Sequence, residues 1–271
     1  MDGLEQKSTV RQLPKRTFQA LTQTVFPVFR ALIKAGYFSL SAEGMDLVPR
    51  TGPVIYVANH AGWFTLDSLL AGLVVADHLG IDHVPWAAGQ DQIFDIPKIG
   101  PFFADSGVFP ASWLKNPETL PPEMESFCIY PEGTEGNCKS FLHAYQMAEW
   151  RTGFLRVALA RGAKIVPVAV LGSEECLPVI APLRFMKPLV GTIVPLPLTL
   201  FPLPARWKFI CHEPVDIKEA LPDFEKDDLD TQKKRLRALA ASLRAQVQHT
   251  LDRETANHGL VRLSKLVNAS R

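Results

Sequence analysis

The sequence lacks the cysteine and histidine patterns of a metal-dependent or disulfide-linked protein. Its four cysteines, Cys128, Cys138, Cys176 and Cys211, are irregularly spaced and include no Cys-x-x-Cys pair. Neither a zinc ribbon nor a disulfide framework is therefore indicated, and a reducing compartment fits best. The seven histidines include no His-Glu-x-x-His motif, which argues against a zinc hydrolase. We expect no metal.

The sequence also has little net charge. Its 29 lysines and arginines almost balance its 28 acidic residues, which gives a formal net charge of +1. Nucleic-acid binding relies on a stronger positive field, so we expect no nucleic-acid partner. Other enzyme signatures are missing too: there is no Gly-x-Ser-x-Gly elbow, no Walker sequence and no dinucleotide-binding glycine fingerprint.

No apolar run suits a membrane-spanning helix. Residues 188–205 carry no charge but contain five prolines, and no helix tolerates that density. We expect this long apolar segment to cover a lipid-chain groove, to dip into a membrane or to pack on the domain's own core. The first 17 residues are too polar for a secretory signal, so we expect the chain to remain in the cytoplasm.

The N-terminal segment predicts a helix with an apolar stripe. Up to residue 34 it carries six basic residues and two acidic ones, and Pro27 is expected to kink or divide the helix. Such a stripe suits an anionic membrane surface or packing on a core. We predict an amphipathic, membrane-associating region at residues 1–37 and an α/β domain at 38–271. The stripe consists of Phe18, Leu21, Val25, Phe29 and Leu32.

From residue 38 onward, short apolar runs alternate with helical patterns. This alternation predicts an α/β fold with a mixed, mostly parallel sheet flanked by helices, in which sites gather beyond the C-terminal ends of strands. Pro167 predicts an edge position or a bulge. Strands are expected within residues 37–44, 53–60, 83–89, 126–133, 163–172 and 205–217, and helices within 66–80, 145–162 and 229–251.

Two stretches carry candidate catalytic groups. "NHAGWFTLD" places His60 after a predicted strand and Asp67 at the start of a predicted helix. A histidine oriented by an aspartate can take a proton from a hydroxyl. "YPEGTEG" places Glu132 and Gly133 in a turn after another strand, where a carboxylate and backbone N–H groups can face a ligand. Taken alone, these stretches also fit a structural hydrogen bond and a surface turn.

In this order the stretches resemble the lysophospholipid and glycerol-phosphate acyltransferase family, the 1-acylglycerol-3-phosphate type. Its members move a fatty acyl group from a coenzyme A or acyl-carrier-protein thioester to a lipid hydroxyl. The resemblance covers roughly residues 38–175, and "CHEPVDI" is a later landmark. It is carried by "AEGMDLVPRTGPVIYVANH", "IFDIPKIGPFFADSGVFPAS", "YPEGTEG" and "IVPVAVLG".

The resemblance implies a glycerol-phosphate-acyltransferase-like fold and a role for each matching residue. His60 is expected to be the general base and Asp67 the acid that orients it. Acyl-CoA or acyl carrier protein would be the donor partner and a lipid the acceptor, with no cofactor. We expect a peripheral or monotopic protein on the cytoplasmic side of a membrane. The residues expected to bind substrate are Asn59, Glu132, Gly133 and Thr134.

The sequence departs from the family pattern in its His–Asp spacing. Six residues separate His60 from Asp67 instead of the common four, and Thr65 occupies the position of the usual acid. An alternative is therefore a catalytically inactive lipid-binding or lipid-transfer protein on the same fold.

A second departure concerns phosphate recognition. Ser112 and Glu135 stand where the family often has arginines, and neither can bind phosphate as a bidentate cation. Lys115 and Lys139 could substitute, although each is expected to be a surface lysine. The acceptor could therefore differ from a simple glycerol phosphate.

Overall fold

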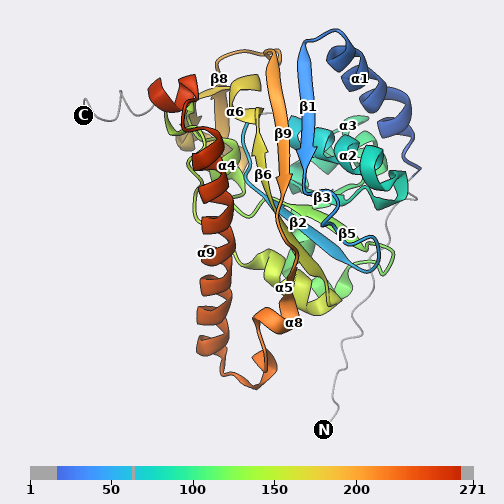
Figure 1. Ribbon diagram of the computed structural model, residues 1–271, viewed down its shortest axis with the longest axis vertical. Coiled ribbons are helices and arrows are strands. Elements are labelled where there is room, and N and C mark those ends of the chain that lie inside the picture. Colours follow the sequence, from blue (N-terminus) through green and yellow to red (C-terminus); the bar gives the residue numbers. More distant parts are fainter. Residues whose placement is uncertain (1–16, 63–64, 264–271) are drawn as a thin grey trace.

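The computed structural model describes residues 17–62 and 65–263. Eight strands form its main sheet (Figure 1): β1 (Phe38–Glu43), β2 (Val54–Ala58), β3 (Trp86–Gly89), β4 (Val108–Pro110), β5 (Ser126–Ile129), β6 (Lys164–Leu171), β9 (Ala205–Cys211) and β10 (Val215–Asp216). The order is β1-β9-β6-β2-β5-β3-β4, with β10 beside β6. Within these described strands, β6 runs antiparallel to β9 and β10, and the other pairs are parallel. The predicted fold class is confirmed.

Helices cover both faces of this sheet. One apolar cluster joins it to α5 (Gly153–Arg161) and α9 (Leu229–Glu254), and a second joins it to α1 (Phe26–Lys34) and α2 (Leu66–Leu79). The shorter helices are α3 (Ile99–Asp105), α4 (Thr134–Asn137), α6 (Ser173–Cys176), α7 (Lys187–Val190) and α8 (Ile217–Ala220).

The central strand β2 is buried along its whole length because it contributes to both clusters. Ile55 and Val57 face the cluster of α5 and α9, whereas Val54, Tyr56 and Ala58 face that of α1 and α2. Successive strand residues point to opposite faces, so a strand covered on both sides is a continuous apolar run. This packing fixes where β2 ends, and the next polar residues lie at the rim of the sheet.

The predicted N-terminal stripe packs on the core. A π-helical turn (Ala20–Val25) leads into α1, and Pro27 lies in the first turn of α1, so the helix is divided there as predicted. Leu21, Val25 and Phe29 are buried with residues of β1, β2 and α2. These residues therefore pack on the core, and association of the N-terminal region with a membrane stays a prediction. Residues 1–16 of the predicted region lie outside the described residues.

Pro167 corrects a prediction, because β6 is an interior strand and not an edge. On one side it pairs with β2, where Pro167 is opposite Val57. On the other side, β10 pairs with residues 164–165 and β9 with residues 168–171. Pro167 falls between these two ladders, so its missing N–H costs no strand hydrogen bond.

The predicted helix over residues 145–162 forms only as α5, from Gly153 onward. Before α5, side chains from other parts of the chain bind the backbone of residues 145–148, which is not helical. Glu174 accepts from the Tyr145 N–H at 3.1 Å, and Glu132 from the Ala148 N–H at 2.8 Å. Tertiary contacts therefore override the local pattern here.

The proline-rich segment contains regular structure that the sequence did not predict. Strands β7 (Val179–Leu183) and β8 (Val194–Pro197) pair antiparallel, with α7 between them. We call residues 179–203 the apolar hairpin. Among the described residues, no helix combines the length and apolar character needed to cross a bilayer.

Candidate active site

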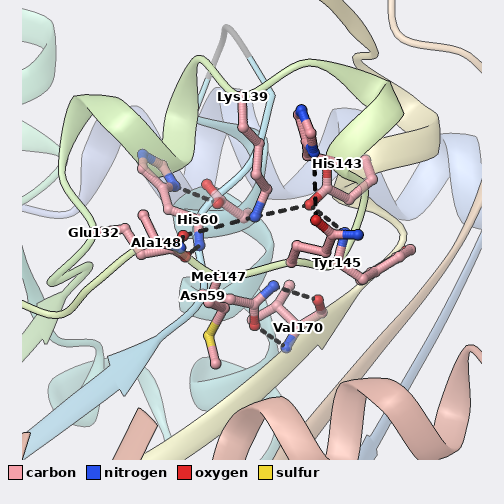
Figure 2. Close-up of polar contacts among 12 residues, drawn as sticks. Asn59, His60, Glu132, Lys139, His143, Tyr145, Met147, Ala148 and Val170 are labelled. Atoms are coloured by element: carbon pink, nitrogen blue, oxygen red, sulfur yellow. Dashed lines mark hydrogen bonds and ion pairs between the residues drawn. The ribbon is translucent and has the colours of Figure 1, made fainter. Parts of the chain in front are cut away.

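His60 lies just beyond the C-terminal end of β2, and hydrogen bonds of its neighbour Asn59 fix its position. The fully buried Asn59 amide donates to the Val170 carbonyl at 2.8 Å and accepts from the Val170 N–H at 2.7 Å (Figure 2). The backbone pairing of β2 with β6 ends at Ala58, and the Asn59 side chain adds two further hydrogen bonds to β6 beyond it. Asn59 is predicted to bind substrate, but in this structure both ends of its amide are occupied by the backbone.

The structure brings His60 and Asp67 together. The His60 Nδ1 atom lies 2.5 Å from Asp67 Oδ2, and both side chains are buried. Asp67 lies in the first turn of α2, where the helix dipole favours a carboxylate, and its Oδ1 accepts the Ser68 N–H at 2.8 Å. The longer connection is accommodated before this helix, which begins at Leu66. The wider spacing therefore still allows the pair to meet.

This contact assigns the tautomer of the neutral imidazole. In that tautomer Nδ1 carries the hydrogen donated to Asp67, which leaves the lone pair on Nε2, the nitrogen that can accept a proton. Within the described part of the chain, Nε2 has no hydrogen-bond partner. The Tyr130 ring stacks on the imidazole with centroids 4.2 Å apart. Burial, with Asp67 and Cys128 nearby, raises the pKa of Tyr130 well above its usual value, so a neutral ring faces His60.

Glu132 binds the backbone around the histidine. Its Oε1 accepts the His60 N–H at 3.0 Å, and its Oε2 accepts the Ala148 N–H at 2.8 Å (Figure 2). The side chain is buried, and Gly136 lies against it so closely that a Cβ would come within 2.5 Å of Glu132 Cβ. Glu132, predicted to bind substrate, thus ties the "YPEGTEG" turn to the "NH" pair.

Lys139 is a buried counter-charge and not the predicted surface lysine. Its Nζ lies 3.0 Å from Glu174 and 3.8 Å from Glu132. Burial opposes the charged ammonium, but these two carboxylates outweigh it and raise the pKa of Lys139. Burial also raises the pKa of Glu174, which Lys139 partly offsets. We call His60, Asp67, Glu132, Lys139 and Glu174 the polar rim.

Gly133 and Thr134, the other two residues predicted to bind substrate, are partly exposed. Gly133 has φ +62°, a conformation that favours glycine. A Cβ there would lie 3.3 Å from the guanidinium of Arg151, an exposed residue. The turn therefore presents a small residue and a neighbouring cation toward solvent.

Comparison with known proteins bears on this arrangement. The chain matches the family model described as acyltransferase over residues 39–171. These residues belong to the acyltransferase family. The acyltransferase domain thus includes β2, the His60–Asp67 pair and the "YPEGTEG" turn. The match ends at Leu171, the last residue of β6, so it includes every residue of the polar rim except Glu174.

Curated relatives of this chain include uncharacterised proteins. One from Mycobacterium tuberculosis is 31% identical over 216 residues, which cover 76% of this chain and 59% of that protein. One from Mycobacterium leprae is 30% identical over 199 residues, covering 70% and 54%. A chloroplastic 1-acyl-sn-glycerol-3-phosphate acyltransferase of Arabidopsis thaliana is 23% identical over 149 residues, covering 52% and 38%. The chain spans about three fifths of the Mycobacterium tuberculosis protein.

A solved structure shares the fold of this chain. The 1-acyl-sn-glycerophosphate acyltransferase PlsC of Thermotoga maritima superposes with a TM-score of 0.53 at 15% identity. The match covers 89% of this chain and 91% of PlsC, and at this identity it concerns the fold.

Sequence reasoning missed three residues of the acyltransferase domain and its surroundings. Tyr130 directly precedes the "PEGTEG" turn, and its place at a strand end was the available signal. Nothing local marked Lys139 or Glu174 as buried, because they meet only through the fold. Among the described residues, no group of three or more His, Cys, Asp and Glu could hold a metal ion.

Proposed function

We propose that this chain transfers a fatty acyl group from an acyl-CoA or acyl-carrier-protein thioester to a hydroxyl of a lysophospholipid or other glycerolipid. His60 is the general base, and Asp67 orients it. The observation that carries the proposal is the 2.5 Å contact between His60 Nδ1 and Asp67 Oδ2, which leaves Nε2 available within an acyltransferase-family domain. The site of action is the cytoplasmic side of a membrane, where such donors occur.

The proposed reaction needs one proton acceptor. Nε2 of His60 takes the hydroxyl proton as the acceptor oxygen attacks the thioester carbonyl, and Asp67 stabilises the imidazolium. The tetrahedral intermediate then expels the thiolate, which receives the proton from the imidazolium. The products are an ester and a free thiol, and nothing is oxidised or reduced.

Glu132 and residues next to the polar rim support this step by position. Glu132 fixes the His60 backbone, and stacking on Tyr130 limits rotation of the imidazole. Gly133 and Thr134 are the residues of the turn that remain partly exposed, so we assign substrate contact to them. Arg151 places a guanidinium beside Gly133, which suits a phosphate-bearing acceptor.

The test is acyl transfer by the purified full chain. Labelled acyl-CoA and, separately, labelled acyl carrier protein are incubated with a membrane lipid extract, using wild type and His60→Ala. We expect acylated lipid from wild type and a loss of about 10²- to 10⁴-fold in the variant, the usual contribution of a positioned base. Matching circular dichroism spectra show that the variant is folded.

The opposite result would favour the inactive lipid-binding alternative. If wild type forms no more acylated lipid than His60→Ala with either donor, the catalytic proposal is wrong. Binding of a fluorescent lysophospholipid without turnover would then identify a lipid-binding protein.

A further inference from the structure

The apolar hairpin is the most exposed apolar surface next to the polar rim. Phe185, Leu189, Leu200 and Phe201 are 78%, 83%, 71% and 79% exposed. Large apolar side chains gathered in one segment mark an interaction site, because water disfavours such a surface. Ile180, Leu196, Leu198 and Leu203 extend it.

The sequence segment that contains the apolar hairpin carries charges of one sign. From residue 176 to residue 212 the sequence contains no acidic residue, but it contains two lysines and two arginines. Arg184 pairs with Glu135, and Lys208 with Glu43 and Glu254. Lys187 and Arg206 are exposed and have no ion-pair partner among the described residues. The surface is therefore apolar and basic.

The apolar hairpin is attached to the turn that completes the candidate active site. The Ser140 hydroxyl donates to the Ile180 carbonyl at 2.7 Å, and Arg184 pairs with Glu135. Gly62, two residues after His60, lies against Leu177, two residues before the apolar hairpin. In Figure 1, β8, α6 and α4 lie together at one end of the main sheet. A surface that binds here also faces the rim.

We propose that the apolar hairpin docks the protein on an anionic lipid bilayer, with Phe185, Leu189, Leu200 and Phe201 entering the interface between headgroups and acyl chains. Lys187 and Arg206 then lie near the lipid phosphates. A second copy of this chain fits less well, because it would bring the unpaired cations of an equal segment, Lys187 and Arg206, against those of this one. This inference rests on the proposed function in one respect: the role that we give to docking is to bring a lipid acceptor to His60.

Vesicle flotation tests the proposal without turnover. The full chain is mixed with phosphatidylcholine vesicles with or without phosphatidylglycerol. The variant Phe185→Ser/Leu200→Ser/Phe201→Ser is compared with the control Ile96→Ser/Leu229→Ser/Leu263→Ser, whose three residues are also exposed. We expect wild type and control to float with anionic vesicles, and the hairpin variant to bind at least tenfold more weakly, since each side chain contributes apolar area.

Three outcomes would overturn the proposal. The hairpin variant could bind like wild type, the control could lose binding equally, or wild type could fail to bind while sedimenting as a dimer that the hairpin variant disrupts. The last result would assign the surface to self-association.

Two further measurements separate docking from catalysis. His60→Ala should float like wild type, because it leaves the hairpin intact. The hairpin variant should keep its rate on a short-chain acceptor dispersed as monomers and lose rate only on vesicle-borne acceptor. Docking without any acyl transfer would leave this proposal standing and overturn the proposed function.

Discussion

The polar rim and the apolar hairpin lie side by side but are organised in opposite ways. In the rim each side chain has a directed partner, such as Glu132 between the His60 and Ala148 N–H groups. In the hairpin, Phe185 and Leu189 are largely exposed, and both side chains are apolar, with no hydrogen-bonding group. A directed network depends on every member, whereas an apolar surface depends on summed area. Single substitutions should therefore be severe in the rim and graded in the hairpin.

The severest effect is expected at Asp67. Asp67→Asn removes the charge that orients His60 and stabilises the imidazolium, so acyl transfer should fall by about 10²- to 10⁴-fold. Thr65→Ala is the matched control, because Thr65 makes no capping bond with its side chain and should keep activity within about twofold. Rates measured with labelled acyl-CoA check both. Greater loss in the Thr65 variant would show that the wrong residue is paired with His60.

The next effect concerns the buried charges of the rim. Lys139→Met leaves Glu132 and Glu174 buried without their counter-charge, so the free energy of unfolding should fall by about 3–5 kcal/mol. Lys187→Met, on the exposed hairpin, should change it by less than about 0.5 kcal/mol. Urea denaturation measures both variants. Equal stability of the two would contradict the comparison between rim and hairpin.

A smaller, graded effect is expected in the hairpin. Leu200→Ser alone should weaken binding to anionic vesicles by about fivefold, because one partly inserted side chain contributes roughly 1 kcal/mol. Adding Phe201→Ser should weaken it by a further factor of similar size. Titration of vesicles against intrinsic fluorescence follows both steps. Complete loss of vesicle binding in Leu200→Ser alone would mean that binding depends on specific contacts of single residues, as in the rim, and not on summed apolar area.

The smallest effect is a pH dependence outside the rim. His258 Nε2 lies 2.7 Å from Glu175, and this hydrogen bond raises the pKa of His258 above its ordinary value. A raised folded-state pKa stabilises the fold below the unfolded pKa, and the contribution disappears as pH rises through the folded pKa. His258→Gln should lower the melting temperature slightly at pH 5.5 and not at pH 9. The exposed His249→Gln should change neither, and an effect independent of pH would refute the ion pair.

The sequence predicted most of the sheet because its strands are simple apolar runs. The range of β2 was predictable, since β2 is buried on both faces. Asp67 could be chosen over Thr65 because it is the first acidic residue after His60, although the common motif spacing points to position 65. Pro167 was misplaced because the gap between β9 and β10 depends on residues far along the chain. Residues 145–152 were predicted as helix because Glu132 and Glu174, which capture their N–H groups, act through tertiary contacts.

The two bonds between Asn59 and Val170 give the molecule an internal reporter. The Val170 amide hydrogen is held by a side chain one residue before His60, so its exchange with solvent deuterium requires the Asn59 amide to let go. Slow exchange at Val170 therefore means that Asn59 is bound to β6 and that His60, the next residue, is in the position described for the candidate active site. Faster exchange, with the rest of β6 still protected, would mark a chain that is folded but whose histidine is out of place.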